Sequence, residues 1–172
     1  MNWSTMISRL IKSRVLESDE DYEPFDELLL WMDDNPSKLD PFLIKILLNG
    51  FFDDTSNPDY MYSLIHGLNA VNNKNPDSYF KEVFDGASII YPHAINWYTT
   101  ILANGLITQR DNNKRFMAAL MSTSVQNLTI IKETITSLIA SSTQYISDRS
   151  HLEIVSNGRD ALETIESLDI LN

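Results

Sequence analysis

Residues 57–71 read NPDYMYSLIHGLNAV and combine a helix-start signal with a helical pattern of apolar residues. An Asn before a helix accepts hydrogen bonds from the free N–H groups of the first turn, and Pro at the first helical position loses no hydrogen bond. The apolar residues that follow recur at i, i+3, i+4 and i+7, the spacing of one helix face. They are Met61, Leu64, Ile65, Leu68 and Val71. The stretch therefore predicts an amphipathic helix over residues 58–72.

The signals that begin and end helices recur along the chain. Prolines stand at positions 41, 58, 76 and 92, which are 17, 18 and 16 residues apart, and glycines at 50, 67, 86 and 105, which are 17, 19 and 19 residues apart. Because glycine supplies the turn that often ends a helix, this spacing predicts one helix and one turn per interval. Two such units make ~35 residues, the length of a helical-hairpin repeat. The sequence predicts an all-α fold, either a compact array of stacked antiparallel helical hairpins similar to HEAT repeats or an irregular bundle.

Apolar periodicity and helix punctuation together place about eight or nine helices in a single domain over residues 1–172. The expected ranges are 4–17, 22–34, 38–49, 58–72, 76–89, 92–104, 111–122, 124–141 and 159–170. Residues 42–48 are apolar nearly all round, which predicts a central helix. Residues 142–157 are ambiguous. Residues 151–155 alternate weakly like a strand, but a lone strand has no pairing partner, so a helix extension or a loop is favoured.

The composition excludes several classes of protein. The chain has 172 residues, of which 43% are hydrophobic, and no cysteine, so a disordered chain, a disulfide scaffold and a thiolate metal site are excluded. Its 24 acidic and 13 basic residues give a net charge of −11, which argues against binding to nucleic acid. No signal-like start occurs, and no apolar run approaches the ~20 residues of a membrane span. We expect a soluble, cytoplasmic protein with no membrane partner.

No catalytic motif is present in the sequence. Its three histidines, His66, His93 and His151, are far apart and form no HExxH pattern. Three carboxylates on the last predicted helix leave a small metal-dependent all-α hydrolase as one alternative. They are Glu163, Glu166 and Asp169. Few basic residues accompany them to hold a phosphate, so a solvated helix face is the simpler interpretation. We expect no enzymatic activity, no cofactor and no metal.

The acidic excess is concentrated in the N-terminal third. Residues 1–60 hold 13 acidic and 5 basic side chains, whereas residues 61–172 hold 11 and 8. Aromatic residues are interleaved with these acids, and acids beside exposed aromatics suit the capture of a basic protein surface. The predicted partner-binding residues are Asp19, Glu20, Asp21, Glu23, Asp33, Asp34, Phe51, Asp53, Asp54 and Tyr60. If Asp19–Asp21 and Asp53–Asp54 share one rim of the array, they form a single negative ridge. A merely solvating surface is the alternative.

Residues 91–107, YPHAINWYTTILANGLI, combine a helix-starting proline, a tryptophan five residues later and an Ile-Leu-x-Asn end. With residues 63–68, SLIHGL, they resemble the all-helical immunity proteins of bacterial polymorphic toxin and contact-dependent growth inhibition systems, in particular immunity protein thirty. The resemblance covers about residues 5–140.

That resemblance implies a cytoplasmic monomer that binds and neutralises the C-terminal domain of a cognate toxin in a 1:1 complex. Such toxins are often basic nucleases, and an acidic surface suits such a partner. The resemblance assigns no contact positions, so the acidic cluster is an inference from charge alone. A helical-repeat adaptor for another basic protein is the remaining alternative.

Overall fold

The computed structural model describes residues 1–107, 110–145 and 148–169. These residues form ten α-helices and two short 3-10 helices, with no strand among them, so the all-α prediction is confirmed. The α-helices are α1 (Trp3–Ser13), α2 (Asp19–Asp34), α3 (Leu43–Gly50), α4 (Pro58–Lys74), α5 (Pro76–Asp85), α6 (Ala87–Ile90), α7 (Ile95–Ile107), α8 (Arg110–Leu120), α9 (Val125–Ser142) and α10 (Arg149–Asp169). The 3-10 helices are η1 (Pro36–Lys38) and η2 (Thr143–Tyr145). Among the described helices, none combines the length and the hydropathy that a bilayer span requires.

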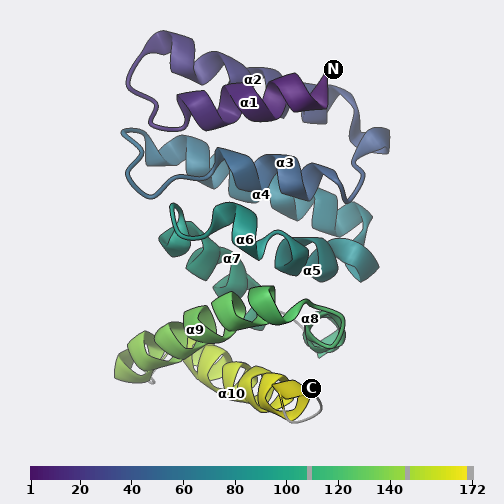
Figure 1. The fold of residues 1–172 in the computed structure, drawn as a ribbon, viewed down its shortest axis with the longest axis vertical. Helices are drawn as coiled ribbons and strands as arrows, with labels where there is room; N and C mark the ends of the chain where they lie inside the picture. The colour runs from purple at the N-terminus through teal and green to yellow at the C-terminus, as the bar shows by residue number, and fades with distance from the viewer. Residues whose placement is uncertain (108–109, 146–147, 170–172) are drawn as a thin grey trace.

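The helices stack along the longest axis of the molecule, with the N-terminus at one end and the C-terminus at the other (Figure 1). Successive layers are the α1–α2 hairpin, the α3–α4 hairpin, α5 and α6 with α7, and finally α8, α9 and α10. Helix α1 packs on α3, and α2 packs on α4. The predicted array of stacked helical hairpins is therefore the observed arrangement.

Proline punctuation predicted the starts of α4 and α5 correctly. The Asn57 side chain accepts a hydrogen bond from the N–H of Asp59 at 3.2 Å, and Pro58 opens α4. Asn75 lies between α4 and α5: its N–H donates to Val71 at 2.9 Å, and its side chain donates to the Leu39 carbonyl at 2.6 Å. These starts were predictable because each cap lies beside its helix in the sequence.

The predicted single helix over residues 76–89 is wrong at Gly86, where the structure divides it into α5 and α6. A Cβ atom at Gly86 would lie 2.3 Å from Leu48 Cδ1, so the glycine allows α3 to approach this junction closely. By contrast, Gly67 and Gly105 lie inside α4 and α7 and do not end helices. Glycine here marks close packing more often than a helix end.

The last helix is longer than predicted, since α10 begins at Arg149 and not near residue 159. Residues 151–155 are helical, so the helix extension is the correct alternative and the strand is wrong for these positions. Asp148 begins the helix by accepting a hydrogen bond from the N–H of Ser150 at 2.7 Å. Residues 146–147 of the ambiguous segment lie outside the described part of the chain.

Apolar burial runs through all layers, and α3 is central as predicted. Its residues Leu43, Ile44, Ile46, Leu47 and Leu48 are at most 2% exposed. Nearer the C-terminus, three buried phenylalanines join α5 to α8. Their ring centroids lie 5.2 Å (Phe80–Phe116) and 4.8 Å (Phe84–Phe116) apart, both edge to face. We call these three residues the aromatic cluster.

Candidate partner-binding site

The outward side of α2 is the most strongly charged helix face in the N-terminal half. Seven acidic side chains are exposed on it, and at ~100° per residue they fall within about 140° of the helix circumference. We call these seven residues, with Leu30 at the centre of the same arc, the α2 acidic face. The acids are Asp19, Glu20, Glu23, Asp26, Glu27, Asp33 and Asp34. Leu30 is 63% exposed, which makes it one of the most exposed large apolar side chains among the described residues.

The amphipathic pattern of α2 fixes this orientation. Its opposite side buries Pro24, Phe25, Leu28 and Met32 against the stack. At the first turn, the Asp21 carboxylate accepts hydrogen bonds from the Ser18 N–H and hydroxyl, both at 3.0 Å. The Ser18 N–H thereby holds the pKa of Asp21 below its ordinary value. Asp21 was predicted to contact a partner, but its visible role is to cap α2.

Most charges on the α2 acidic face are uncompensated. Glu27 pairs with Arg9 of α1, and Asp26 accepts a hydrogen bond from the Tyr60 hydroxyl at 2.9 Å. In the part of the chain that the structure describes, no basic side chain pairs with the other five acids of this face. Unpaired like charges repel one another. A basic surface that covers this face therefore lowers its electrostatic free energy.

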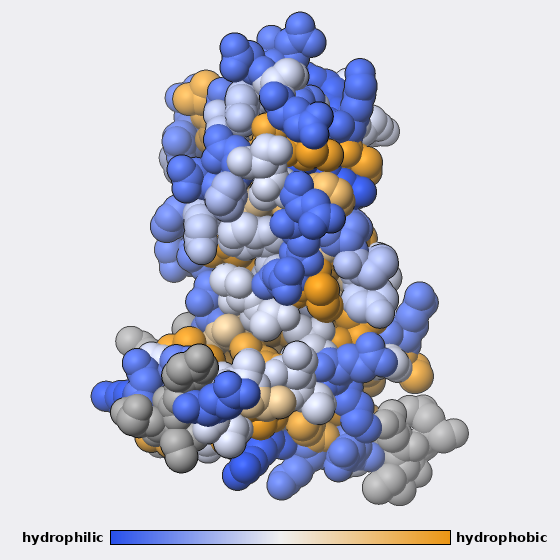
Figure 2. Space-filling model, turned by 90° about the vertical axis from the view of Figure 1, so that its left-hand side faces the viewer, coloured by the Kyte–Doolittle hydropathy of each residue, from blue (hydrophilic) through white to orange (hydrophobic). Residues whose placement is uncertain are grey.

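Three hairpin loops form one side of the stack, and we call loops 14–18, 51–57 and 91–94 the loop rim. The Ser56 N–H donates to the Val15 carbonyl at 2.8 Å, and the Asp53 N–H donates to the His93 carbonyl at 3.1 Å. Figure 2 faces this side and shows hydrophilic residues over much of its N-terminal half. Asp19–Asp21 directly follow the first of these loops, and Asp53 and Asp54 lie in the second, so both acidic groups are on this rim. Asp33 and Asp34 lie at the opposite end of α2, about 20 Å away.

Asp53 has a structural role that its sequence position does not reveal. Its carboxylate accepts hydrogen bonds from the N–H groups of Asn96, at 3.1 and 3.2 Å, and Trp97, at 3.4 Å. It thus caps α7 from more than 40 residues away. For this reason α7 begins at Ile95, and the predicted start at Pro92 is wrong. Its neighbour Asp54 is exposed.

Asp53→Ala is therefore expected to lower the free energy of unfolding by about 1 kcal/mol, the usual value of an N-cap. Asp54→Ala is the matched control, because it removes the same charge one residue away without uncapping α7. Urea denaturation followed by circular dichroism measures both variants. Equal stability of the two variants would contradict the capping role.

Of the two predicted aromatic contacts, Phe51 needs correction. Phe51 is 0% exposed, so its side chain belongs to the core and is not available to a partner. Tyr60 is half-buried and stacks on Tyr22 with ring centroids 4.9 Å apart. Burial and the nearby Asp26 raise the pKa of Tyr60 to about 12, which keeps its hydroxyl a donor. Phe52 lies under the Arg14 guanidinium, 4.9 Å from the ring centroid.

The carboxylates of the hydrolase alternative do not converge in the described part of the chain. Among the described residues, no three His, Asp or Glu side chains are placed to hold a metal ion. Glu166 pairs with Lys132 at 3.8 Å, and Glu163 is exposed on α10. The Asp169 side chain lies outside the described part.

Comparison with known families relates this architecture to a function. A family model described as Immunity protein 30 matches residues 12–116, more than half of the chain. This chain belongs to the Immunity protein 30 family. The match confirms the resemblance seen in residues 91–107 and runs from the end of α1 into α8. No curated protein and no solved structure matches this immunity protein.

The matched region contains the complete α2 acidic face and the loop rim, whereas α9 and α10 lie beyond it. Membership of an immunity family implies a cognate toxin as the binding partner of this immunity protein. Sequence reasoning missed Leu30, Asp26 and Glu27 as members of the candidate surface. A helical projection of residues 19–34 carries the signal, since all three fall on the same arc as Glu23 and Asp34.

Proposed function

We propose that this immunity protein neutralises its cognate toxin by covering a basic surface of the toxin with the α2 acidic face. The observation that supports this most directly is the exposed Leu30 surrounded by acids, six of which have no basic partner among the described residues. Charge complementarity speeds encounter, and an apolar residue at the centre of an interface supplies an anchor from which water is excluded.

The charge distribution also favours a nuclease-type toxin. A protein that binds nucleic acid neutralises phosphates with lysine and arginine side chains, so its working surface is basic. An acidic helix that covers this surface competes with the nucleic acid for the same cations. Inhibition then requires no catalytic chemistry from the immunity protein and no cofactor.

Coexpression tests the proposed function. The toxin domain encoded beside the immunity gene should arrest growth alone and lose this effect when the immunity protein is present. Size-exclusion chromatography with light scattering should show a 1:1 complex of the purified proteins. If the neighbouring toxin neither binds nor is neutralised, the proposed function is wrong.

Charge reversal tests the proposed face. The double variant Glu23→Lys/Asp34→Lys is expected to slow association with the toxin by about tenfold or more at low salt, because it replaces attraction by repulsion. It should also flatten the salt dependence of the association rate. Both positions are exposed, and the caps Asp21 and Asp53 stay intact. Stopped-flow or surface plasmon resonance kinetics measure these rates.

The matched control is Asp160→Lys/Glu163→Lys on α10. It changes the net charge equally, at exposed positions outside the family-matched region. An equal loss of association rate in both double variants would mean that only net charge matters and that binding is not localised to α2.

A further inference from the structure

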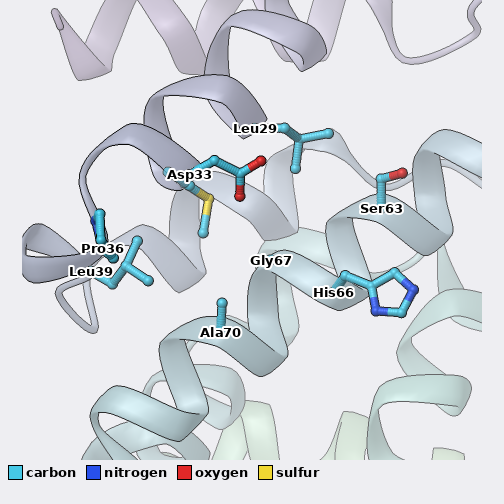
Figure 3. Close-up of a pocket in the computed structure, with 9 residues that line it drawn as sticks. Leu29, Asp33, Pro36, Leu39, Ser63, His66, Gly67 and Ala70 are labelled. Carbon is cyan, nitrogen blue, oxygen red and sulfur yellow. The ribbon is translucent and has the colours of Figure 1, made fainter.

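A pocket of about 400 Å³ opens between α2 and α4, at the end of α2 that carries Asp33. Figure 3 shows Asp33 reaching from α2 into the space between the helices, with His66 on the α4 side. The wall formed by α4 leaves this space open because α4 presents small residues there at i, i+4 and i+7. These are Ser63, Gly67 and Ala70. The sequence of α4 thus leaves a hollow where larger side chains would close the contact with α2.

The lining of the pocket combines an apolar wall with one carboxylate. Leu29 and Met32 contribute apolar surface from α2, and Ala70 contributes it from α4. Asp33 is exposed, and no basic side chain of the described residues pairs with it. The nearby Lys38 donates instead to the Asn35 side chain at 2.9 Å. His66 is the one other titratable group in the lining, and it lies across the pocket on α4.

This combination fits a long side chain that has an apolar stem and a cationic end. Lysine and arginine both bury their stems on apolar surface and keep the charged group at a polar edge. Arginine suits the site better, since its planar guanidinium forms two parallel hydrogen bonds to one carboxylate. Arginine is also enriched among the residues that dominate binding energy at protein interfaces.

We propose that this pocket receives an arginine side chain of the bound toxin, with the guanidinium on Asp33 and the stem against Leu29 and Met32. The proposal rests on the proposed function, because it names the contact by which the toxin engages one end of the α2 acidic face. General attraction between the α2 acidic face and a basic toxin does not require any side chain to enter the pocket, so the pocket contact is a separate claim.

Three single variants test the pocket in binding assays with the toxin domain encoded beside the immunity gene. Asp33→Asn removes the charge with little change of shape, and Ala70→Leu fills the pocket without any change of charge. Each is expected to weaken binding by about tenfold or more. Asp34→Asn is the matched control: it removes the adjacent charge from the same face but lies outside the pocket lining, so a loss of less than about threefold is expected. Isothermal titration calorimetry measures the affinities, and thermal melts verify that each variant is folded.

Two results would overturn the pocket while the proposed function stands. One is wild-type affinity in both Asp33→Asn and Ala70→Leu. The other is an equal loss in Asp33→Asn and Asp34→Asn with none in Ala70→Leu, which would indicate general electrostatics. An Ala70→Leu variant that fails to fold leaves the comparison of Asp33→Asn with Asp34→Asn to decide.

A small-molecule titration keeps the pocket testable if the neighbouring toxin does not bind at all. N-acetyl-arginine methylamide, titrated into the labelled protein, should shift the backbone amide signals of Ser63, His66 and Ala70, and Asp33→Asn should abolish these shifts. N-acetyl-norleucine methylamide is the uncharged control. Absence of shifts with the arginine compound would overturn the proposal in that case.

Discussion

Phe116→Ala is expected to lower the free energy of unfolding by about 3–5 kcal/mol, the range for removing a buried phenylalanine. Phe116 is 0% exposed and contacts the rings of Phe80 and Phe84 edge to face. Its removal leaves a cavity where α8 meets α5, and two aromatic contacts are lost with it. Guanidinium denaturation followed by circular dichroism measures the loss, which is a large part of the stability of a typical domain.

Two other substitutions serve as controls for Phe116→Ala. Phe116→Leu keeps most of the buried volume, so it should cost clearly less than Phe116→Ala. Met121→Ala changes a side chain that is 68% exposed just after α8, and little change is expected. A loss below about 1 kcal/mol in Phe116→Ala would show that the aromatic cluster is not a main source of stability.

Leu30→Ala is expected to weaken toxin binding by about 30-fold, equivalent to about 2 kcal/mol, with no measurable loss of stability. The side chain is 63% exposed in the free protein, so truncating it removes little folding energy. In the complex it would occupy the centre of a charged interface, where an apolar anchor is fully desolvated. Calorimetric titration with the toxin domain gives the affinity, and a thermal melt gives the stability.

Leu152→Ala is the matched control for this variant. Leu152 is 51% exposed on α10, and it lies outside the region that matches the family. Its truncation should leave affinity unchanged. Similar affinities for Leu30→Ala and the unmodified protein would place the toxin interface away from the centre of α2.

The helices were predictable wherever their signals are local. Asn57 and Pro58 open α4 because the capping side chain is two residues from the N–H group it satisfies. The start of α7 was not predictable, because the cap of this helix comes from Asp53, which lies in another loop. The break at Gly86 likewise depends on Leu48, a residue of α3 that no local pattern connects to it.

The sequence predicts the excess of acidic residues in the candidate surface, but it does not predict which of these side chains are exposed to a partner. Counting acids selects Asp19, Glu20 and Glu23 correctly as exposed charges, but it treats Asp53 in the same way although its carboxylate caps a helix. Phe51 was predicted to contact a partner because Asp53 and Asp54 follow it closely in the sequence. Its position directly after α3 instead places its side chain in the core. Only the three-dimensional stack separates the acids that stabilise the fold from those available to a partner.

The layered stack keeps the proposed recognition helix apart from the aromatic cluster. Helix α2 packs on α1 and α4, and the α3–α4 hairpin lies between it and the layers that hold Phe116 (Figure 1). In such stacks stability is approximately a sum of contributions from each unit and its neighbours. Substitutions on the outer side of α2 are therefore expected to cost the other layers little folding energy. If the toxin binds this helix as proposed, the outer surface of α2 can change to match a diverging toxin while the packing of the other layers stays the same.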